Sequence, residues 1–304
     1  MAIRKPDELN FADKTFTLVL SGQPGLGKTS LALSAPDPLL FDLDKGIARV
    51  RAEHRKLTAE ESSYDELLND MTSDEYKACK TVIIDTAGSL VQMMQPWAQK
   101  TDAKAARDGR AMYGVIKREF ERLTAQMRRD GKNVIIIFHT TEVQKGDQVV
   151  TRLSCEGSTK DIVWTPADLG GHMFMMGKRR MIGFSPTEEY FAKGCYGISG
   201  VREVPTLSQG VQNDFLTRLF DECRRNIAEE MNALQPLQEA YSAIMEKFNP
   251  MIANAGDAAA LNEALREITD AEHALTSKKE LGALLAAKAK ELNLKYDKGQ
   301  KAYV

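Results

Sequence analysis

The stretch of sequence that decides the fold is Gly22-Gln23-Pro24-Gly25-Leu26-Gly27-Lys28-Thr29-Ser30. The apolar run TFTLVLS precedes it and KTSLALSA follows, so the loop is expected to join a buried strand to a helix. Glycines let the backbone curl until several N–H groups point at phosphate oxygens, and the helix directs its positive end at the same phosphates. All nine residues are therefore candidates for nucleotide binding, with Lys28 bridging the β- and γ-phosphates and Thr29 as a ligand of Mg²⁺.

Three further side chains are expected at the same edge of the sheet, because each stands at the end of an apolar strand. Asp85 ends the run VIID and is placed to hold Mg²⁺, as a Walker B aspartate does. Asp44, in FDLD, could polarise the attacking water, or it could begin a tight turn. His139 ends the run IIIFH and could contact the γ-phosphate, or it could simply form a local hydrogen bond.

The residues around these strand ends favour ATP over GTP. The segment DTAG, which starts at Asp85, matches the DxxG turn of GTPases, and GTPases read guanine with an NKxD-type motif after a later strand. Here that strand is followed by HTTE, and no NKxD motif stands in the right context. A small-molecule kinase would need a lid that carries arginine, and the pair Arg179-Arg180 keeps that alternative open. ATP and Mg²⁺ are the expected cofactors.

The order of apolar runs predicts an α/β core over residues 13–208, with a mainly parallel central sheet. Strands are expected at 16–20, 38–43, 82–85 and 134–138, with three more at 172–176, 181–184 and 190–192, and a helix at 113–129. Residues 209–304 have a helical composition and are expected to form a C-terminal domain. Its four predicted helices are 215–232, 237–248, 258–275 and 278–292. Residues 1–12 are expected to be a polar N-terminal arm.

The composition limits the partners. Of the 304 residues, 43% are hydrophobic and 28% charged, and the formal net charge is -2 at pH 7. This balance gives no overall attraction to nucleic acid or membranes, so any contact with nucleic acid must come from a local patch. The four cysteines are scattered, which argues against a zinc site and favours a reduced, intracellular protein. Because no signal peptide or membrane-spanning run is present, the expected location is the cytoplasm.

Five segments together resemble the phage-encoded RecA-like ATP-binding proteins, some of which act in single-strand annealing or recombination. They are GQPGLGKTS, LLFDLDKG, TVIIDTAG, YGVIKREFERLTAQMRRDGKNVIIIFHTTE and EEYFAKG. The resemblance implies a RecA-like P-loop NTPase core that assembles with copies of itself. It places Asp44 where the family has a water-activating acid, often glutamate, and gives His139 a likeness to the RadA branch. It also implies a basic residue supplied by the neighbouring subunit, with Lys193 as the best match. Lys178, Arg179 and Arg180 are the alternatives.

RecA-like proteins hold single-stranded DNA with two loops, and both have candidate counterparts here. The first follows the strand that ends at Asp85, and its candidates are Trp97, Lys100, Lys104, Arg107 and Arg110. Cations beside an aromatic ring suit a single strand, although an ordinary solvated helix explains the segment as well. The second is expected as a long polar loop over residues 142–168, with the candidates Lys145, Arg152, Lys160 and Trp164.

These features predict a phage protein that binds and hydrolyses Mg-ATP, slowly or under stimulation by DNA, and acts on single-stranded DNA in recombination or annealing. A single-strand-binding protein is a further candidate partner. Two alternatives stay open. One is a nucleotide-gated regulatory or partner-binding protein without DNA activity, and the other is a DNA motor similar to RadA or DnaB.

Overall fold

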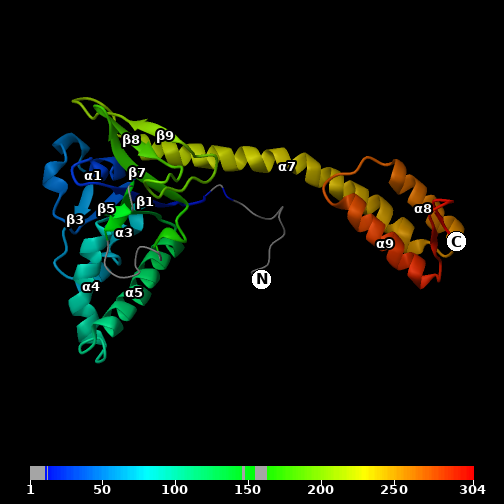
Figure 1. Cartoon of the computed structure of the whole chain (residues 1–304), viewed down its shortest axis with the longest axis horizontal. Coiled ribbons are helices and arrows are strands. Elements are labelled where there is room, and N and C mark those ends of the chain that lie inside the picture. The colour runs from blue at the N-terminus through cyan, green and yellow to red at the C-terminus, as the bar shows by residue number, and fades with distance from the viewer. Residues whose placement is uncertain (1–10, 12, 146–147, 155–162) are drawn as a thin grey trace. The chain divides into compact units, whose positions relative to one another are not determined.

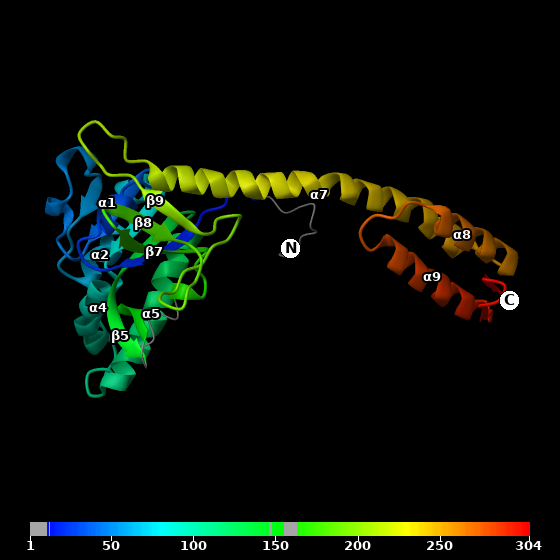
Figure 2. The same ribbon diagram turned by 45° about the horizontal axis from the view of Figure 1, so that its top comes forward.

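The computed structural model describes residues 11, 13–145, 148–154 and 163–304. The chain divides into two compact units, with the boundary between Asn226 and Ile227. The first unit holds the central sheet and the phosphate-binding loop, and the second is mainly helical (Figures 1 and 2). Nearly all of the expected N-terminal arm, residues 1–12, lies outside the described residues.

One sheet organises the first unit, and nine strands of the described residues take part in it. Its strand order is β3-β2-β4-β5-β1-β7-β8-β9, with β6 paired to β5. The strands are β1 (Thr17–Gly22), β2 (Pro38–Asp42), β3 (Leu57–Ala59), β4 (Thr81–Asp85), β5 (Asn133–Lys145), β6 (Gln148–Ser154), β7 (Leu169–Met176), β8 (Arg179–Gly183) and β9 (Val201–Val204). Strands β1 to β5 and β7 pair in parallel, whereas β6, β8 and β9 join antiparallel. The predicted α/β class with a mainly parallel sheet is confirmed.

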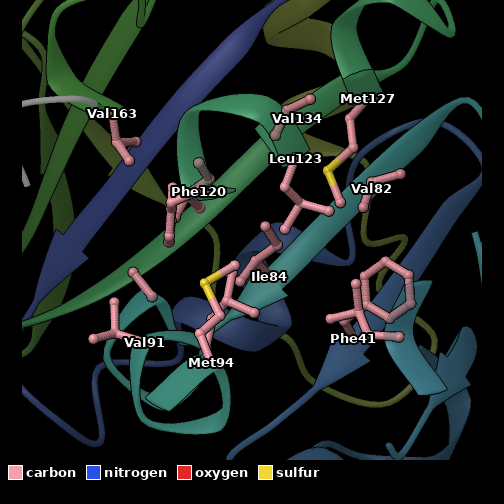
Figure 3. Packing of buried hydrophobic residues seen from close by; sticks show 14 of the residues in the cluster. Phe41, Val82, Ile84, Val91, Met94, Phe120, Leu123, Met127, Val134 and Val163 are labelled. Carbon is pink, nitrogen blue, oxygen red and sulfur yellow. The ribbon is translucent and has the colours of Figure 1, made fainter. Parts of the chain in front are cut away.

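The central strands are apolar because both faces of the sheet are covered. Every residue of β1, β2 and β4 is buried. Two long helices, α4 (Ala87–Thr101) and α5 (Gly109–Arg129), contribute to one core. Figure 3 shows Met94 of α4 and Phe120 and Leu123 of α5 with Val82 and Ile84 of β4 in this core. The shorter helices of the unit are α1 (Lys28–Ala32), α2 (Tyr64–Asp70) and α3 (Asp74–Ala78).

Two expectations for the second half of the sheet were wrong. Residues 142–168 do not start as a loop, because β5 continues to Lys145 and pairs antiparallel with β6. The β-branched residues Thr141 and Val143 favour this extension. Residues 190–192 are not a strand, and β9 takes the expected place of a third short strand. Tyr190 instead stacks on His172, with 4.5 Å between the ring centroids.

The C-terminal helices differ from the prediction in one respect. Residues 215–254 form a single helix, α7 (Phe215–Asn254), with Pro236 and Pro250 inside it. Proline normally interrupts a helix, but the residues around Pro236 are mostly strong helix formers, so the helix resumes. The first turns of α7 belong to the first unit, which is why the division falls after the expected boundary at residue 208. Leu216, Phe220 and Cys223 are buried there.

The second unit has its own apolar core. The remaining elements are α8 (Ala258–Asp270), α9 (Ser277–Glu291), β10 (Tyr296–Asp297) and β11 (Ala302–Tyr303). Phe248 of α7, Leu261 of α8 and Leu281 of α9 are at most 1% exposed and pack in one cluster. Asn262 fixes the end of the chain, since its amide accepts from Tyr303 N and donates to Tyr303 O. No helix of the described residues is long and apolar enough to cross a membrane.

Candidate nucleotide-binding site

The phosphate-binding loop runs from the end of β1 to the start of α1. Gly25 and Gly27 both have φ of 84°, a left-handed conformation that favours glycine. At Gly22 a Cβ atom would lie 2.8 Å from the carbonyl oxygen of Met173 on β7, so a side chain does not fit there. The motif glycines therefore fold the loop so that the N-terminus of α1 opens towards the site.

Lys28 is buried within this loop, with 5% of its surface exposed. Its Nζ donates to the carbonyl oxygens of Gly22 and Gln23, at 2.9 Å each. Burial lowers the pKa of Lys28 to about 8, and the charges of Asp85 and Asp44 oppose that shift only in part. The ammonium is thus held against neutral carbonyls, where a phosphate would be a better partner.

Asp85 and Thr29 form the part of the site suited to a metal. Thr29 Oγ1 donates to Asp85 Oδ2 at 2.6 Å, and only 4% of Asp85 is exposed. Burial raises the pKa of Asp85, with the hydrogen bond from Thr29 opposing it. A hydroxyl and a buried carboxylate are oxygen donors of the kind that Mg²⁺ takes.

Asp44 belongs to the site, and the turn that it could have begun is made by Asp42 instead. Asp42 accepts from the backbone N–H groups of Gly46 and Ile47, at 2.8 Å each. Asp44 lies beside the end of β4, because its own N–H donates to Asp85 O at 3.1 Å. Sequence reasoning placed Asp44 at this edge of the sheet but left open whether it polarises the water or begins a turn.

The Asp44 carboxylate is held by three side chains. His139 Nε2 lies 3.3 Å from Oδ2, and the hydroxyls of Ser89 and Thr86 donate to Oδ1. The hydrogen bond with His139 is the largest cause that lowers the pKa of Asp44, so the carboxylate is ionised at neutral pH. Sequence reasoning missed Thr86 and Ser89, although hydroxyls one and four residues after Asp85 could have signalled them.

His139 and Glu142 connect the loop to β5. His139 is the register partner of Gly22 on β1, which puts it directly beside the phosphate-binding loop. Its Nδ1 is buried and has no hydrogen-bond partner among the described residues. Gln23 Nε2 donates to Glu142 Oε1 at 2.5 Å, a contact that sequence reasoning did not foresee. The loop is thus tied to the strand that leads into the β5–β6 hairpin.

A cavity of about 480 Å³ joins these groups, a volume in the range of small-molecule sites. The loop residues from Pro24 to Ser30 line it together with Asp44, Asp85 and His139. Its other wall comes from two segments that sequence reasoning missed, one at residues 49–51 and 54 and one at residues 204–207 and 212–215. Arg180 and Arg218 also line it.

Lys193 lies elsewhere in the structure. Its backbone pairs with Gly170 of β7, and its Nζ donates to Ala167 O at 2.5 Å. It does not line the cavity, and a role across a subunit boundary stays a prediction. Of the alternatives, Lys178 is exposed and Arg179 pairs with Glu203 at 3.4 Å.

The structure describes most of the residues that are candidates for DNA contact. Trp97 packs edge-on against Tyr64, with ring centroids 5.1 Å apart, and it borders the core. Lys100 lies 3.6 Å from Asp65. The remaining candidates on and after α4, which are Lys104, Arg107 and Arg110, are exposed. Lys145 ends β5, and Lys160 lies outside the described residues. DNA contact by these residues stays a prediction.

The fold and the site together define a P-loop nucleoside triphosphatase, and comparison with known proteins agrees. A model of the AAA domain family matches residues 14–196, and the chain belongs to this family. None of the curated proteins matches the chain. Among solved structures, a KaiC-like protein from the archaeon Pyrococcus horikoshii is similar over 62% of this chain and 89% of its own, with 16% identity and a TM-score of 0.38.

Proposed function

We propose that the protein is a Mg²⁺-dependent ATPase that acts on single-stranded DNA in recombination or annealing, as an assembly of several copies. One observation carries the ATPase part. The pair Thr29 and Asp85 stands beside Lys28 in the same cavity as the Asp44–His139 pair. Phosphate binding, metal binding and water orientation therefore have side chains at one edge of the sheet. The preference for ATP rests on the missing guanine-reading motif.

The Mg²⁺ ion fits the donors of this site. Thr29 and Asp85 would hold it, and it would neutralise charge on the β- and γ-phosphate oxygens. The buried Asp85 supports this role, because a carboxylate whose pKa is raised by burial gains from a nearby cation. Lys28 would leave the carbonyls of Gly22 and Gln23 to bind phosphate oxygens.

Hydrolysis would proceed by in-line attack of a water molecule on the γ-phosphate. Asp44 orients this water by accepting its hydrogen bond, while Ser89 and His139 fix the carboxylate. Because the pKa of Asp44 is lowered, Asp44 is an acceptor throughout neutral pH and only a weak base. The new bond joins the water oxygen to phosphorus, the bond from phosphorus to the bridging oxygen breaks and leaves ADP, and both protons of the water leave with the inorganic phosphate.

The DNA part rests on the resemblance and on one link in the structure. His139 leads along β5 into the β5–β6 hairpin, and Glu142 of the same strand binds Gln23. A change in the phosphates would thereby reach a surface hairpin through a single strand. This is the kind of connection by which hydrolysis could alter the affinity for a DNA strand.

A cytoplasmic location remains part of the proposal.

A nucleotide-gated regulatory protein is the second candidate. Two observations favour it, since Trp97 packs on Tyr64 and Lys100 lies beside Asp65. These contacts leave fewer side chains of the segment 97–110 available to bind DNA. In this alternative ATP binds and the link through Glu142 changes the affinity for a protein partner.

The rate of phosphate release from ATP distinguishes the candidates. It should be measured for the wild type and Lys28→Ala, alone and with single-stranded or double-stranded DNA. The proposal expects turnover without an added acceptor, stimulated by the single strand and lost in Lys28→Ala. Tight ATP binding with no effect of DNA would favour the regulatory candidate, and transfer of phosphate only to an added acceptor would favour a kinase.

A further inference from the structure

Arg180 reaches the phosphate-binding loop from within the same chain. A Cβ atom built on Gly27 would lie 3.9 Å from both Nε and Cζ of Arg180, and Arg180 lines the nucleotide cavity. Gly27 is the residue just before α1 and belongs to the phosphate-binding loop. The guanidinium therefore stands over the start of that helix.

The sheet fixes the direction from which Arg180 approaches. Arg180 of β8 pairs with Met175 on β7 and with Val204 on β9, so its backbone is held on both sides. In the strand order, β8 lies beyond β7 on one side of β1, whereas β2, β4 and β5 lie on the other. Asp44 and Asp85 follow or end strands on that other side. Arg180 thus faces the loop from the flank opposite the two carboxylates.

The charge of Arg180 is not matched by a carboxylate in the described residues, unlike that of its neighbours. Arg179 pairs with Glu203, and Arg218, which also lines the cavity, binds Asp214 at 2.9 Å. The half-buried guanidinium of Arg180 thus lies beside the phosphate-binding loop without an anionic partner among the described residues. A phosphate bound in the cavity would supply one.

We propose that Arg180 binds the phosphate chain of the nucleotide in cis, as a second cation opposite Lys28. This inference deepens the proposed ATPase function and rests on it. The planar guanidinium can donate two hydrogen bonds to phosphate oxygens, which a lysine cannot do in the same geometry. The site then draws both cations from one chain, and a basic residue from a neighbouring subunit is not required for phosphate binding.

Affinity for a fluorescent ADP tests the contact. Arg180→Ala should bind ADP about tenfold or more weakly than the wild type, since a charge-assisted hydrogen bond is lost. Arg180→Lys should recover part of that loss. Arg179→Ala is the matched control, one residue away on the same strand and paired outside the cavity, and should bind ADP as the wild type does. Equal affinity of Arg180→Ala and Arg179→Ala would overturn the proposal.

Mixing two impaired variants tests whether Arg180 acts in cis. Lys28→Ala and Arg180→Ala are combined in equal amounts, at an ATP concentration too low to saturate Arg180→Ala, and ATP turnover is compared with the mean of the separate proteins. The proposal expects no recovery, because every chain lacks one of its own two cations. Recovery well above the mean would show that Arg180 serves a neighbouring subunit, and would overturn it.

Two further measurements distinguish a failure of the inference about Arg180 from a failure of the proposed function. Thermal unfolding without nucleotide should be alike in Arg180→Ala and Arg179→Ala, and if Arg180→Ala is unstable, Arg180→Gln takes its place. If the wild type neither binds nor hydrolyses ATP in a Lys28-dependent way, the proposed function itself fails. If the wild type is active but Arg180→Ala binds ADP as tightly as Arg179→Ala does, the inference about Arg180 fails and the proposed function stands.

Discussion

The burial of Lys28 lowers the stability of the folded protein as long as no nucleotide is bound. Its ammonium is buried against two carbonyl oxygens, and its pKa is lowered to about 8. In the unfolded chain the same group has an ordinary, higher pKa. The unfolded state therefore binds this proton more tightly, and the charge of Lys28 lowers the free energy of unfolding at neutral pH.

Lys28→Met should raise the free energy of unfolding at pH 7 by about 1–2 kcal/mol in the absence of nucleotide. The gain should be fully present below pH 8 and should shrink as the pH rises towards the unfolded pKa, where lysine is neutral in both states. Urea unfolding of wild type and variant at pH 7 and pH 10 measures it. A variant that is less stable than the wild type at pH 7 would contradict this account of Lys28.

His172 is a second buried base beside the loop. Its Nδ1 lies 3.1 Å from Ser21 Oγ, and burial, with the charge of Lys28, lowers its pKa to about 4. Because the folded pKa lies below the unfolded value, this residue should cost stability as the pH falls from about 6.5 towards 4. His172→Gln, which can still bind Ser21, should lose less stability between pH 7 and pH 4.5 in urea unfolding. An unchanged pH dependence would refute the assignment.

At the level of single residues, the sequence located the groups that local motifs mark. Lys28, Thr29 and Asp85 lie in the phosphate loop and at a strand end, and such positions follow from the order of residues along the chain. The positions of Arg180 and Glu142 beside the phosphate-binding loop were not predicted, because each residue reaches the loop through strand pairing. Only the register of β5 against β1, and of β8 against β7 and β9, brings them there.

Among the elements, the start of α7 is anchored on the residues that follow the phosphate-binding loop. Ser34, just after α1, accepts from Leu216 N through its hydroxyl at 2.9 Å and from Thr217 N through its carbonyl at 3.1 Å. Asn213 adds a hydrogen bond to Ser30 O at 2.8 Å. Ser34 thus caps a helix that is remote in sequence, and the wall of the cavity is held against α1.

Ser34→Ala should destabilise the first unit by about 1–2 kcal/mol, the usual cost of a lost helix cap or an unpaired buried N–H group. Because residues 212–215 line the cavity, affinity for ADP should fall as well. Chemical unfolding and ADP titration of the same variant give both values. A stability within about 0.5 kcal/mol of the wild type would argue against the cap, since surface substitutions usually stay in that range.

Element boundaries followed the apolar pattern where a strand is buried on both faces, as in β1 and β4. The prediction failed at the β5–β6 hairpin and at α7, where the deciding factor is not local. Strand β6 exists because it pairs with the end of β5, and α7 continues past Pro236 because its neighbours favour helix. Turn-forming and helix-breaking residues alone indicated interruptions at both places.

For the whole molecule, the division after Asn226 predicts that the two units are separable. Each has its own apolar core, one around Phe120 and Ile84 and the other around Phe248 and Leu261. All described residues that line the nucleotide cavity belong to the first unit.

A chain that ends at Asn226 should therefore bind ADP with an affinity within about threefold of the full chain, a difference of about 0.6 kcal/mol or less in binding free energy. Isothermal titration of both proteins is the measurement. A fragment that folds but does not bind ADP would show that residues after Asn226 take part in the site.

The central claim is that Asp44 and its partners hydrolyse ATP at the edge of the sheet, and turnover of Asp44→Asn tests it most directly. The amide keeps the size of the carboxylate but not its charge, so Mg-ATP should still bind. Steady-state hydrolysis at saturating Mg-ATP should fall by about 100-fold or more, the usual effect of losing a positioned acceptor. Hydrolysis by Asp44→Asn at close to the wild-type rate would contradict the account.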